Sequence, residues 1–148
     1  MKKLLLTILL LCIPLNAFAV NIDEYLNKSY VGVSYEEGLN GDLPFLIAFA
    51  NSNDIFSIMK FAPIGEMVYN EFNGKYNFCI VNTKIKENKN FYNAFGLKEK
   101  PPVLLIINPH TQTFYQINKK YYNKDALRLI LNEFYERINQ ENQQKSPV

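Results

Sequence analysis

The chain has 148 residues, of which 48% are apolar and 20% charged, and its formal net charge is +2. This length suits one domain, and the composition excludes disordered and fibrous proteins and gives no sign of nucleic-acid binding. Two cysteines are too few for a disulfide framework, and one histidine leaves little for a histidine-based metal site or a Ser-His-Asp triad.

Residues 1–19 predict a cleaved export signal that is not part of the folded domain. Two lysines follow the first methionine, an apolar stretch fills 4–13, and Ala17-Phe18-Ala19 matches a cleavage site. The apolar stretch is too short to span a hydrocarbon core of about 30 Å, which favours a signal peptide over a membrane anchor. We therefore expect cleavage after Ala19 and a periplasmic or secreted bacterial protein with no membrane span.

Removal of the signal changes the balance of charges and of cysteines. Two of the 16 basic residues leave with it, so 14 remain against 14 acidic ones and the net charge is zero. Cys12 leaves as well, and Cys79 is the only cysteine of the mature chain. A lone cysteine in an exported protein is either buried or available for pairing with another chain.

The apolar patterns of the mature chain predict an α/β domain at 43–139. An N-terminal extension at 20–42, with a short strand and a short helix, precedes this domain, and a polar C-terminal tail at 140–148 follows it. The predicted elements of the domain are, in chain order, a strand at 43–50, a helix at 55–72, a strand at 76–83, a helix at 87–95, strands at 103–107 and 113–118, and a helix from Asn123 to about Ile138. This order indicates a mixed sheet flanked by helices.

Prolines and glycines mark the boundaries of these elements. Pro63 lies inside the first long helix and should kink it, and Gly74 and Gly96 end the two helices that precede them. Pro101 and Pro102 come directly before the most strand-like run of the chain.

The order of these landmarks resembles the thioredoxin fold, and the resemblance covers residues 43–138. It implies a three-layer sandwich with a central mixed β-sheet flanked by helices. Counted from Gly96, the cis-proline of that family corresponds to Pro101, with Pro102 as the immediate alternative. Cis bonds are found before only about 5–6% of prolines in folded proteins, so the position needs a structural reason.

The resemblance does not extend to the catalytic residues of the family. The redox motif Cys-x-x-Cys falls on Ile55-Phe56-Ser57-Ile58. The stretch from Phe49 to Pro63 carries one extra residue, so Asp54 or Phe56 is an alternative aligned position, and neither has a thiol. The buried acid of the first core strand corresponds to Ala48. Dithiol–disulfide exchange needs an attacking thiolate and a second, resolving thiol. We therefore assign no catalytic residue, no metal ligand and no cofactor.

The same resemblance suggests a site for binding another protein. It places Ile55, Phe56, Ser57 and Ile58 beside Pro101 and Pro102, on the surface where relatives hold substrate polypeptides. One interpretation is an apolar patch that binds an extended segment of another exported or envelope protein, in an assembly or folding-assistance role. The other is that the extension covers these side chains or that they belong to the core.

Cys79 supports an alternative function. It lies in the middle of a strand, where a buried and inert thiol is favoured. The alternative is a thiol–disulfide redox protein that acts through Cys79 together with a cysteine of its partner. A third possibility is a structural subunit of an envelope assembly, for which the fold is only a scaffold. His110, in a polar turn, is expected to be solvated rather than a ligand.

The lysines of the mature chain are expected to be solvated. Lys84, Lys86 and Lys89 alternate with polar and acidic residues, and Lys119-Lys120 precedes two tyrosines. Because the mature domain is neutral, these residues do not indicate a nucleic-acid partner.

Overall fold

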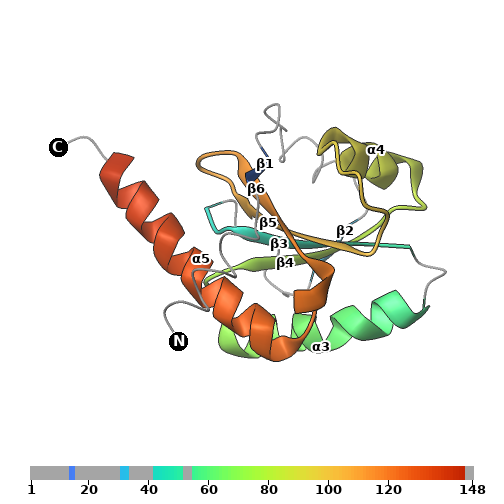
Figure 1. Cartoon of the computed structure of the whole chain (residues 1–148), viewed down its shortest axis with the longest axis horizontal. Coiled ribbons are helices and arrows are strands. Elements are labelled where there is room, and N and C mark those ends of the chain that lie inside the picture. Colours follow the sequence, from blue (N-terminus) through green and yellow to red (C-terminus); the bar gives the residue numbers. More distant parts are fainter. Residues whose placement is uncertain (1–13, 16–30, 34–41, 52–54, 146–148) are drawn as a thin grey trace.

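A mixed sheet forms the middle layer of the molecule, with helices on both of its faces (Figure 1). The computed structural model describes residues 14–15, 31–33, 42–51 and 55–145. The elements are β1 (Pro14–Leu15), β2 (Val31–Val33), β3 (Phe45–Ala50), α3 (Ile55–Glu71), β4 (Asn77–Asn82), α4 (Lys86–Ala94), β5 (Val103–Asn108), β6 (Thr113–Ile117), a 3₁₀ turn η1 (Lys119–Tyr121) and α5 (Lys124–Lys145).

Four strands, in the order β6-β5-β3-β4, make up the body of this sheet, and β1 and β2 extend it at its two margins. β3 runs parallel to β4 and antiparallel to β5, so that Ile47 pairs with Cys79 on one side and with Leu105 on the other. Every residue of β3 and β5 is buried. Both faces of these strands are covered, which explains why they read as continuous apolar runs instead of alternating ones.

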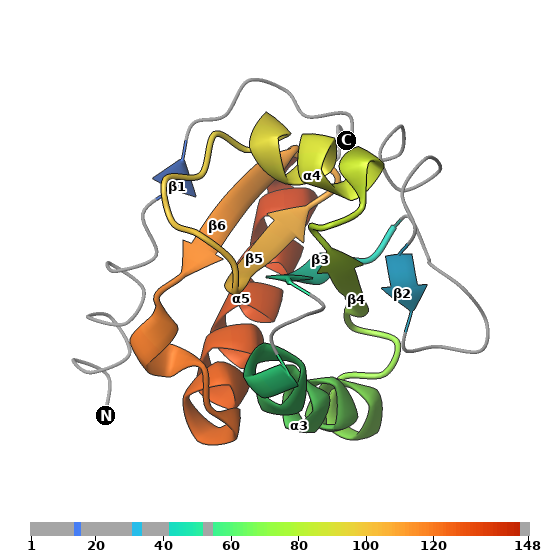
Figure 2. The same ribbon diagram turned by 90° about the vertical axis from the view of Figure 1, so that its right-hand side faces the viewer.

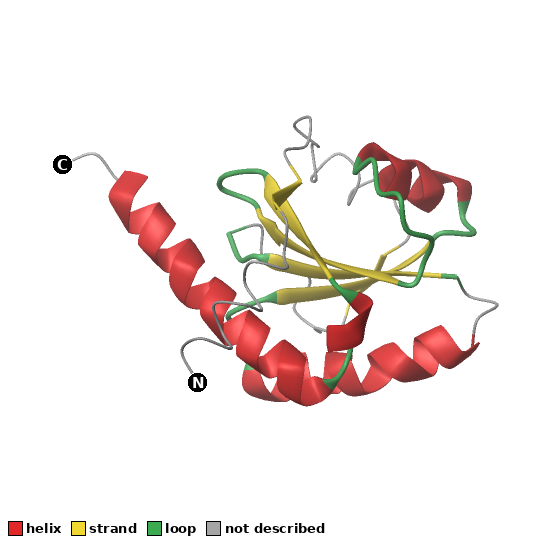
Figure 3. Cartoon of the chain, viewed as in Figure 1, coloured by secondary structure: helices red, strands yellow, loops and turns green. Residues whose placement is uncertain are grey.

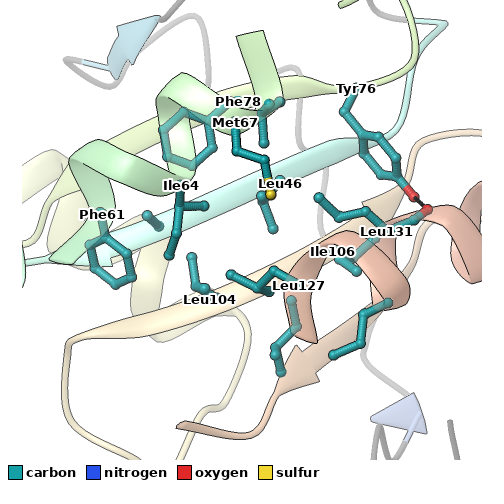
Figure 4. Close-up of a cluster of buried hydrophobic side chains, with 14 of the residues drawn as sticks. Leu46, Phe61, Ile64, Met67, Tyr76, Phe78, Leu104, Ile106, Leu127 and Leu131 are labelled. Atoms are coloured by element: carbon teal, nitrogen blue, oxygen red, sulfur yellow. Dashed lines mark hydrogen bonds between the residues drawn. The ribbon is translucent and has the colours of Figure 1, made fainter. Parts of the chain in front are cut away.

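Helices α3 and α5 cover one face of the sheet. Their apolar side chains, such as Ile64 and Leu131, pack with Leu46 and Ile106 of the central strands (Figure 4). The Tyr76 hydroxyl, just before β4, donates a hydrogen bond of 2.8 Å to the Leu131 carbonyl of α5. On the outer side of this layer, an exposed ion pair between Arg128 of α5 and Glu71 of α3 joins the two helices.

Helix α4 covers the opposite face (Figure 3). Its core is aromatic: the Phe49 ring meets those of Phe91, Tyr92 and Phe95 at centroid distances of 5.3–5.8 Å, mostly edge to face. Aromatic pairs prefer this geometry. The two faces of the sheet therefore carry two separate cores, and the three-layer α/β arrangement expected from the sequence is observed.

The predicted ends of the helices agree with the structure at both glycines and at Asn123. Gly74 and Gly96 have positive φ angles of 74° and 61°, a conformation that glycine adopts without steric cost. The Asn123 side chain accepts a hydrogen bond from the Ala126 amide at 3.0 Å and so caps α5.

The C-terminal tail differs from the expectation. We expected the chain to leave the helix near Asn139, whereas α5 continues to Lys145. The sequence beyond Asn139 is rich in Gln, Glu and Lys, which are good helix formers. In addition, Arg137 and Glu141 form an i,i+4 ion pair at 2.9 Å, which stabilises a helix across this boundary.

The two margins of the sheet come from the N-terminal part of the chain. The strand expected near residue 31 is β2, which pairs antiparallel with β4. At the other margin Pro14 and Leu15 pair with Tyr115 and Phe114 of β6. The expected cleavage after Ala19 would remove these two residues, and that cleavage stays a prediction. The short helix expected at 34–37 lies outside the described residues.

Candidate functional site

One end of the sheet carries both the two prolines and the start of α3. Helix α3 begins at Ile55, shortly after β3 ends, and β5 begins at Val103, directly after Pro101 and Pro102. Val103 pairs with Phe49 near the end of β3, which brings the two segments together. The ends of β4 and β6 lie there too, given the strand directions. We call this the proline end; it faces the viewer in Figure 2.

The peptide bond between Pro101 and Pro102 is cis. Pro102 is therefore the cis-proline, and the assignment to Pro101 is wrong. The position depends on where β5 begins, because Val103 follows the cis residue directly, and a count from Gly96 does not contain that information. Neither proline has a backbone N–H, so this stretch offers carbonyl acceptors and no donors.

A buried tyrosine holds the beginning of β5 in place. The Leu104 amide, two residues after the cis-proline, donates a hydrogen bond of 2.7 Å to the Tyr122 hydroxyl. Tyr122 is 5% exposed, and its ring lies 5.9 Å from that of Phe61 in α3. Burial raises the pKa of Tyr122 above its ordinary value, so the hydroxyl stays protonated. Tyr122 thus connects the two segments that meet at the proline end.

Two further contacts fix the loop between α4 and β5. The Tyr92 hydroxyl donates to the Glu99 carbonyl, and the Lys119 ammonium donates to the Lys100 carbonyl at 3.1 Å. Lys119 also forms an ion pair of 3.5 Å with the Glu99 carboxylate. The sequence did not identify Tyr92 or Tyr122 as site residues. The sequence draws attention to Tyr122 only through the adjacent pair Tyr121-Tyr122, and such a pair does not predict a hydrogen bond to the start of β5.

The predicted binding residues Ile55, Phe56, Ser57 and Ile58 form the first turn of α3 at this end. The structure places the backbone of this turn at the same end of the sheet as the proline segment, because β3 ends there and β5 begins there. Their side chains lie outside what the structure describes, so whether they are exposed stays a prediction. Pro63 lies inside α3, which continues on both sides of it.

Cys79 lies in the core on the α4 side of the sheet, whereas α3 lies on the other side. Its side chain is completely buried. Burial raises the pKa of the thiol to about 12, so almost no thiolate is present at neutral pH. The thiolate is the reactive form of cysteine, and this environment therefore disfavours the alternative of a redox protein that acts through Cys79.

The opposite end of the sheet holds His110. The residue is exposed, as expected, and its Nε2 lies 3.0 Å from the carbonyl oxygen of Asp42. Among the residues that the structure describes, no group of three or more His, Cys, Asp and Glu side chains is placed to hold a metal ion. In the same part of the chain no helix is long and apolar enough to cross a membrane.

Comparison with known proteins identifies the family of this chain. A family model described as a thioredoxin-like domain matches residues 29–133, which is more than two thirds of the chain. No individual curated protein matches the sequence. The matched region begins before β2 and ends within α5, and so includes the whole proline end.

Proposed function

The chain belongs to the thioredoxin-like domain family, and on this premise we propose that it is an exported protein that binds an extended segment of another exported or envelope protein. In this proposal the binding surface is formed by Ile55, Phe56, Ser57, Ile58, Pro101 and Pro102. The protein does not catalyse thiol–disulfide exchange.

One observation carries this proposal: the first turn of α3 and the cis-proline segment lie together at one end of the sheet. Three of the four residues in that turn are apolar or aromatic, and the fourth is serine. Exposed apolar patches are typical of surfaces that bind other proteins, and in this proposal the side chains of the turn form such a patch. Position and composition together support a binding surface at this place.

The proline segment also limits how a partner can bind. Because Pro101 and Pro102 lack N–H groups, a partner strand can donate hydrogen bonds to their carbonyls but receives none from them. A complete two-way ladder of added-strand hydrogen bonds is therefore impossible at these residues. We expect side-chain contacts from the first turn of α3 to supply the remaining affinity.

The residues at the redox positions support a role without thiol chemistry. By the resemblance, Ile55 and Ile58 correspond to the two cysteines of the family, and the alternative positions Asp54 and Phe56 carry no thiol either, so no side chain there can attack or resolve a disulfide. Cys79 is buried in the other core. These features favour binding over catalysis.

A displayed library of random peptides, selected on the processed protein, tests the proposal. An enriched peptide is then labelled, and its dissociation constant is measured with the wild-type protein and with the double variant Ile55→Ser/Ile58→Ser. We expect the double variant to bind at least about tenfold more weakly, which corresponds to the loss of one central apolar contact.

The matched control is the double variant Tyr69→Ser/Leu129→Ser. These residues are the two large apolar side chains that the described part of the chain exposes, at 49% and 45%. They lie in α3 and α5, away from the first turn of α3. Circular dichroism of all variants checks that they fold. Equal loss of binding in both double variants, or no loss in Ile55→Ser/Ile58→Ser, would contradict the proposal.

A further inference from the structure

Three separate segments bring lysines to the proline end. Lys84 and Lys86 follow β4, Lys98 and Lys100 precede the cis-proline, and Lys119 and Lys120 form η1 after β6. All six side chains are exposed. In the sequence these pairs are far apart, and only the strand directions place them at the same end of the sheet (Figure 2). We call these six residues the lysine group.

Among the described residues, few carboxylates lie in the segments that carry the lysine group. The same described segments contain two carboxylates, Glu87 and Glu99, and of the six lysines only Lys119 forms an ion pair within the described part of the chain. Five further acids of the sequence lie outside the described residues: Asp23, Glu24, Glu36, Glu37 and Asp54.

Four carboxylates on α3 and α5 form ion pairs with other basic residues, and one of these pairs joins Arg137 to Glu141. Arg128 pairs with Glu71 and Asp125, and Lys124 lies 3.8 Å from Glu66. Within the described part of the chain, the lysine group therefore gives the proline end an excess of exposed positive charge.

We infer that the proline end binds an acidic extended polypeptide segment, and this inference rests on the function proposed above. Charge complementarity selects an acidic partner, because unpaired lysines attract carboxylates and accelerate encounter with them. The alternation of side chains along an extended segment lets acidic residues reach the lysines on one side of it while the other side meets the first turn of α3.

The chemistry of this end favours a polypeptide over a phosphate-rich partner. The described segments that carry the lysine group contain no arginine. Arginine is the residue that forms bidentate contacts with phosphate. Pro101 and Pro102 add backbone carbonyls, which need a hydrogen-bond donor. The backbone of a peptide supplies N–H donors along with acidic side chains, and the backbone of a nucleic acid supplies neither N–H donors nor carboxylates.

Three matched fluorescent peptides test the inference. In each, threonine alternates with a second residue, which is glutamate, glutamine or lysine, over about twelve residues, enough to extend across the end of a small domain. Binding to the processed protein is measured by fluorescence anisotropy at low and at physiological salt. We expect the glutamate peptide to bind most tightly, and its affinity to fall as salt screens the charges.

Two double variants of equal charge identify the surface. Lys98→Gln/Lys100→Gln should weaken binding of the glutamate peptide about fivefold, as expected for the loss of two exposed charge pairs. Lys75→Gln/Lys124→Gln, which removes two lysines outside the lysine group, should leave the dissociation constant unchanged within about twofold. All four residues are exposed or half-buried, so both variants should fold.

The outcomes separate this inference from the proposed function. If library peptides bind at Ile55 and Ile58 while the glutamate and glutamine peptides bind equally well or not at all, the proposed function stands and the acidic partner is rejected. The inference also fails if both double variants lose the same affinity. Equal or tighter binding of a single-stranded DNA oligonucleotide or of phosphatidylglycerol vesicles, lost in Lys98→Gln/Lys100→Gln, would assign the lysine group to phosphates instead.

Discussion

Burial determines the chemistry of Cys79. Its thiol has no exposed surface and lies among Ile47, Phe91 and Leu105 in the core on the α4 side. A thiol there is in contact with apolar groups that cannot stabilise a negative charge, which raises its pKa. Reactive cysteines need an exposed and electropositive position, and Cys79 has neither property.

A thiol-labelling experiment tests this conclusion. We expect Cys79 of the processed protein to resist an aromatic disulfide reagent at about pH 8 and to react fully in denaturant, because labelling requires unfolding. Rapid labelling of the native protein would contradict the burial of Cys79 and favour the redox alternative. Cys79→Ala, which cannot react, gives the background.

The same pKa predicts a loss of stability at alkaline pH. The fold holds the neutral thiol up to a pKa of about 12, whereas the unfolded chain ionises near pH 8.5. The unfolded state therefore binds fewer protons above that pH, and the free energy of unfolding should fall by about 1 kcal/mol between pH 8 and 9.5. Chemical denaturation should show this loss in the wild type, and Cys79→Ala should lack this part of it. Equal losses in both proteins would contradict the assignment.

Tyr122 is the residue that we expect to matter most for the shape of the proline end. Tyr122→Phe removes the hydroxyl that accepts a hydrogen bond from the Leu104 amide, and it should lower the free energy of unfolding by about 1–2 kcal/mol. The neighbouring half-buried Tyr121 provides the control, since Tyr121→Phe deletes the same atom and should change stability by less than about 0.5 kcal/mol. Denaturant titration of both variants measures the difference, and equal effects would argue against the role given to Tyr122.

At the scale of elements, α3 lies close to the sheet because of one glycine. A Cβ atom at Gly65 would lie 2.7 Å from the Phe78 ring, and Phe78 is buried. Glycine weakens an isolated helix by about 1 kcal/mol relative to alanine, yet here the missing side chain allows α3 to pack on β4.

We therefore expect Gly65→Ala to destabilise the protein by about 1–2 kcal/mol, because the clash with Phe78 outweighs the gain in helix propensity. Asn70→Ala is the control. It lies exposed in the same helix and should raise stability by a few tenths of a kcal/mol, roughly the propensity difference alone. In the background of Phe78→Leu, which has a smaller side chain, Gly65→Ala should lower the free energy of unfolding by less than it does in the wild type, as measured by denaturant titration. A more stable Gly65→Ala would show that the two elements have room to separate.

The sequence predicted the elements well and the site only partly, for a physical reason. Helix α3 and strands β3 and β5 have strong local patterns, and Asn123, Gly74 and Gly96 act on the backbone around them, so their roles were visible. The cis bond at Pro102, the contact from Tyr122 to Leu104 and the lysine group depend on which strands pair. Which strands are neighbours in the sheet depends on the packing of the whole core, so it cannot be predicted from a short stretch of sequence.

At the scale of the whole molecule, net charge is a poor description of the surface. The mature chain is neutral by count, and this gave no reason to expect a charged partner. In the described part of the chain the lysine group lies at the proline end, whereas acids and bases on α3 and α5 pair with one another. A neutral protein can therefore associate with an acidic partner at a rate that depends on salt.

The expected cleavage after Ala19 would remove β1, the outermost strand beside β6. β1 covers two residues along the free side of β6, and it belongs to the segment for which we expect cleavage after Ala19. Loss of β1 would leave that side of β6 with unpaired N–H and C=O groups, which readily pair with a strand of another chain. In hydrogen exchange, we expect the outward amides of β6 to exchange faster in the processed protein than in the uncleaved precursor, and the inward ones to be unchanged. Identical exchange in both forms would contradict this.

If the expected cleavage after Ala19 takes place during export, the pairing of β1 with β6 would differ between precursor and processed protein. In the precursor, Pro14 and Leu15 would shield part of the free side of β6. After cleavage, that side of β6 would become available to a strand of another chain.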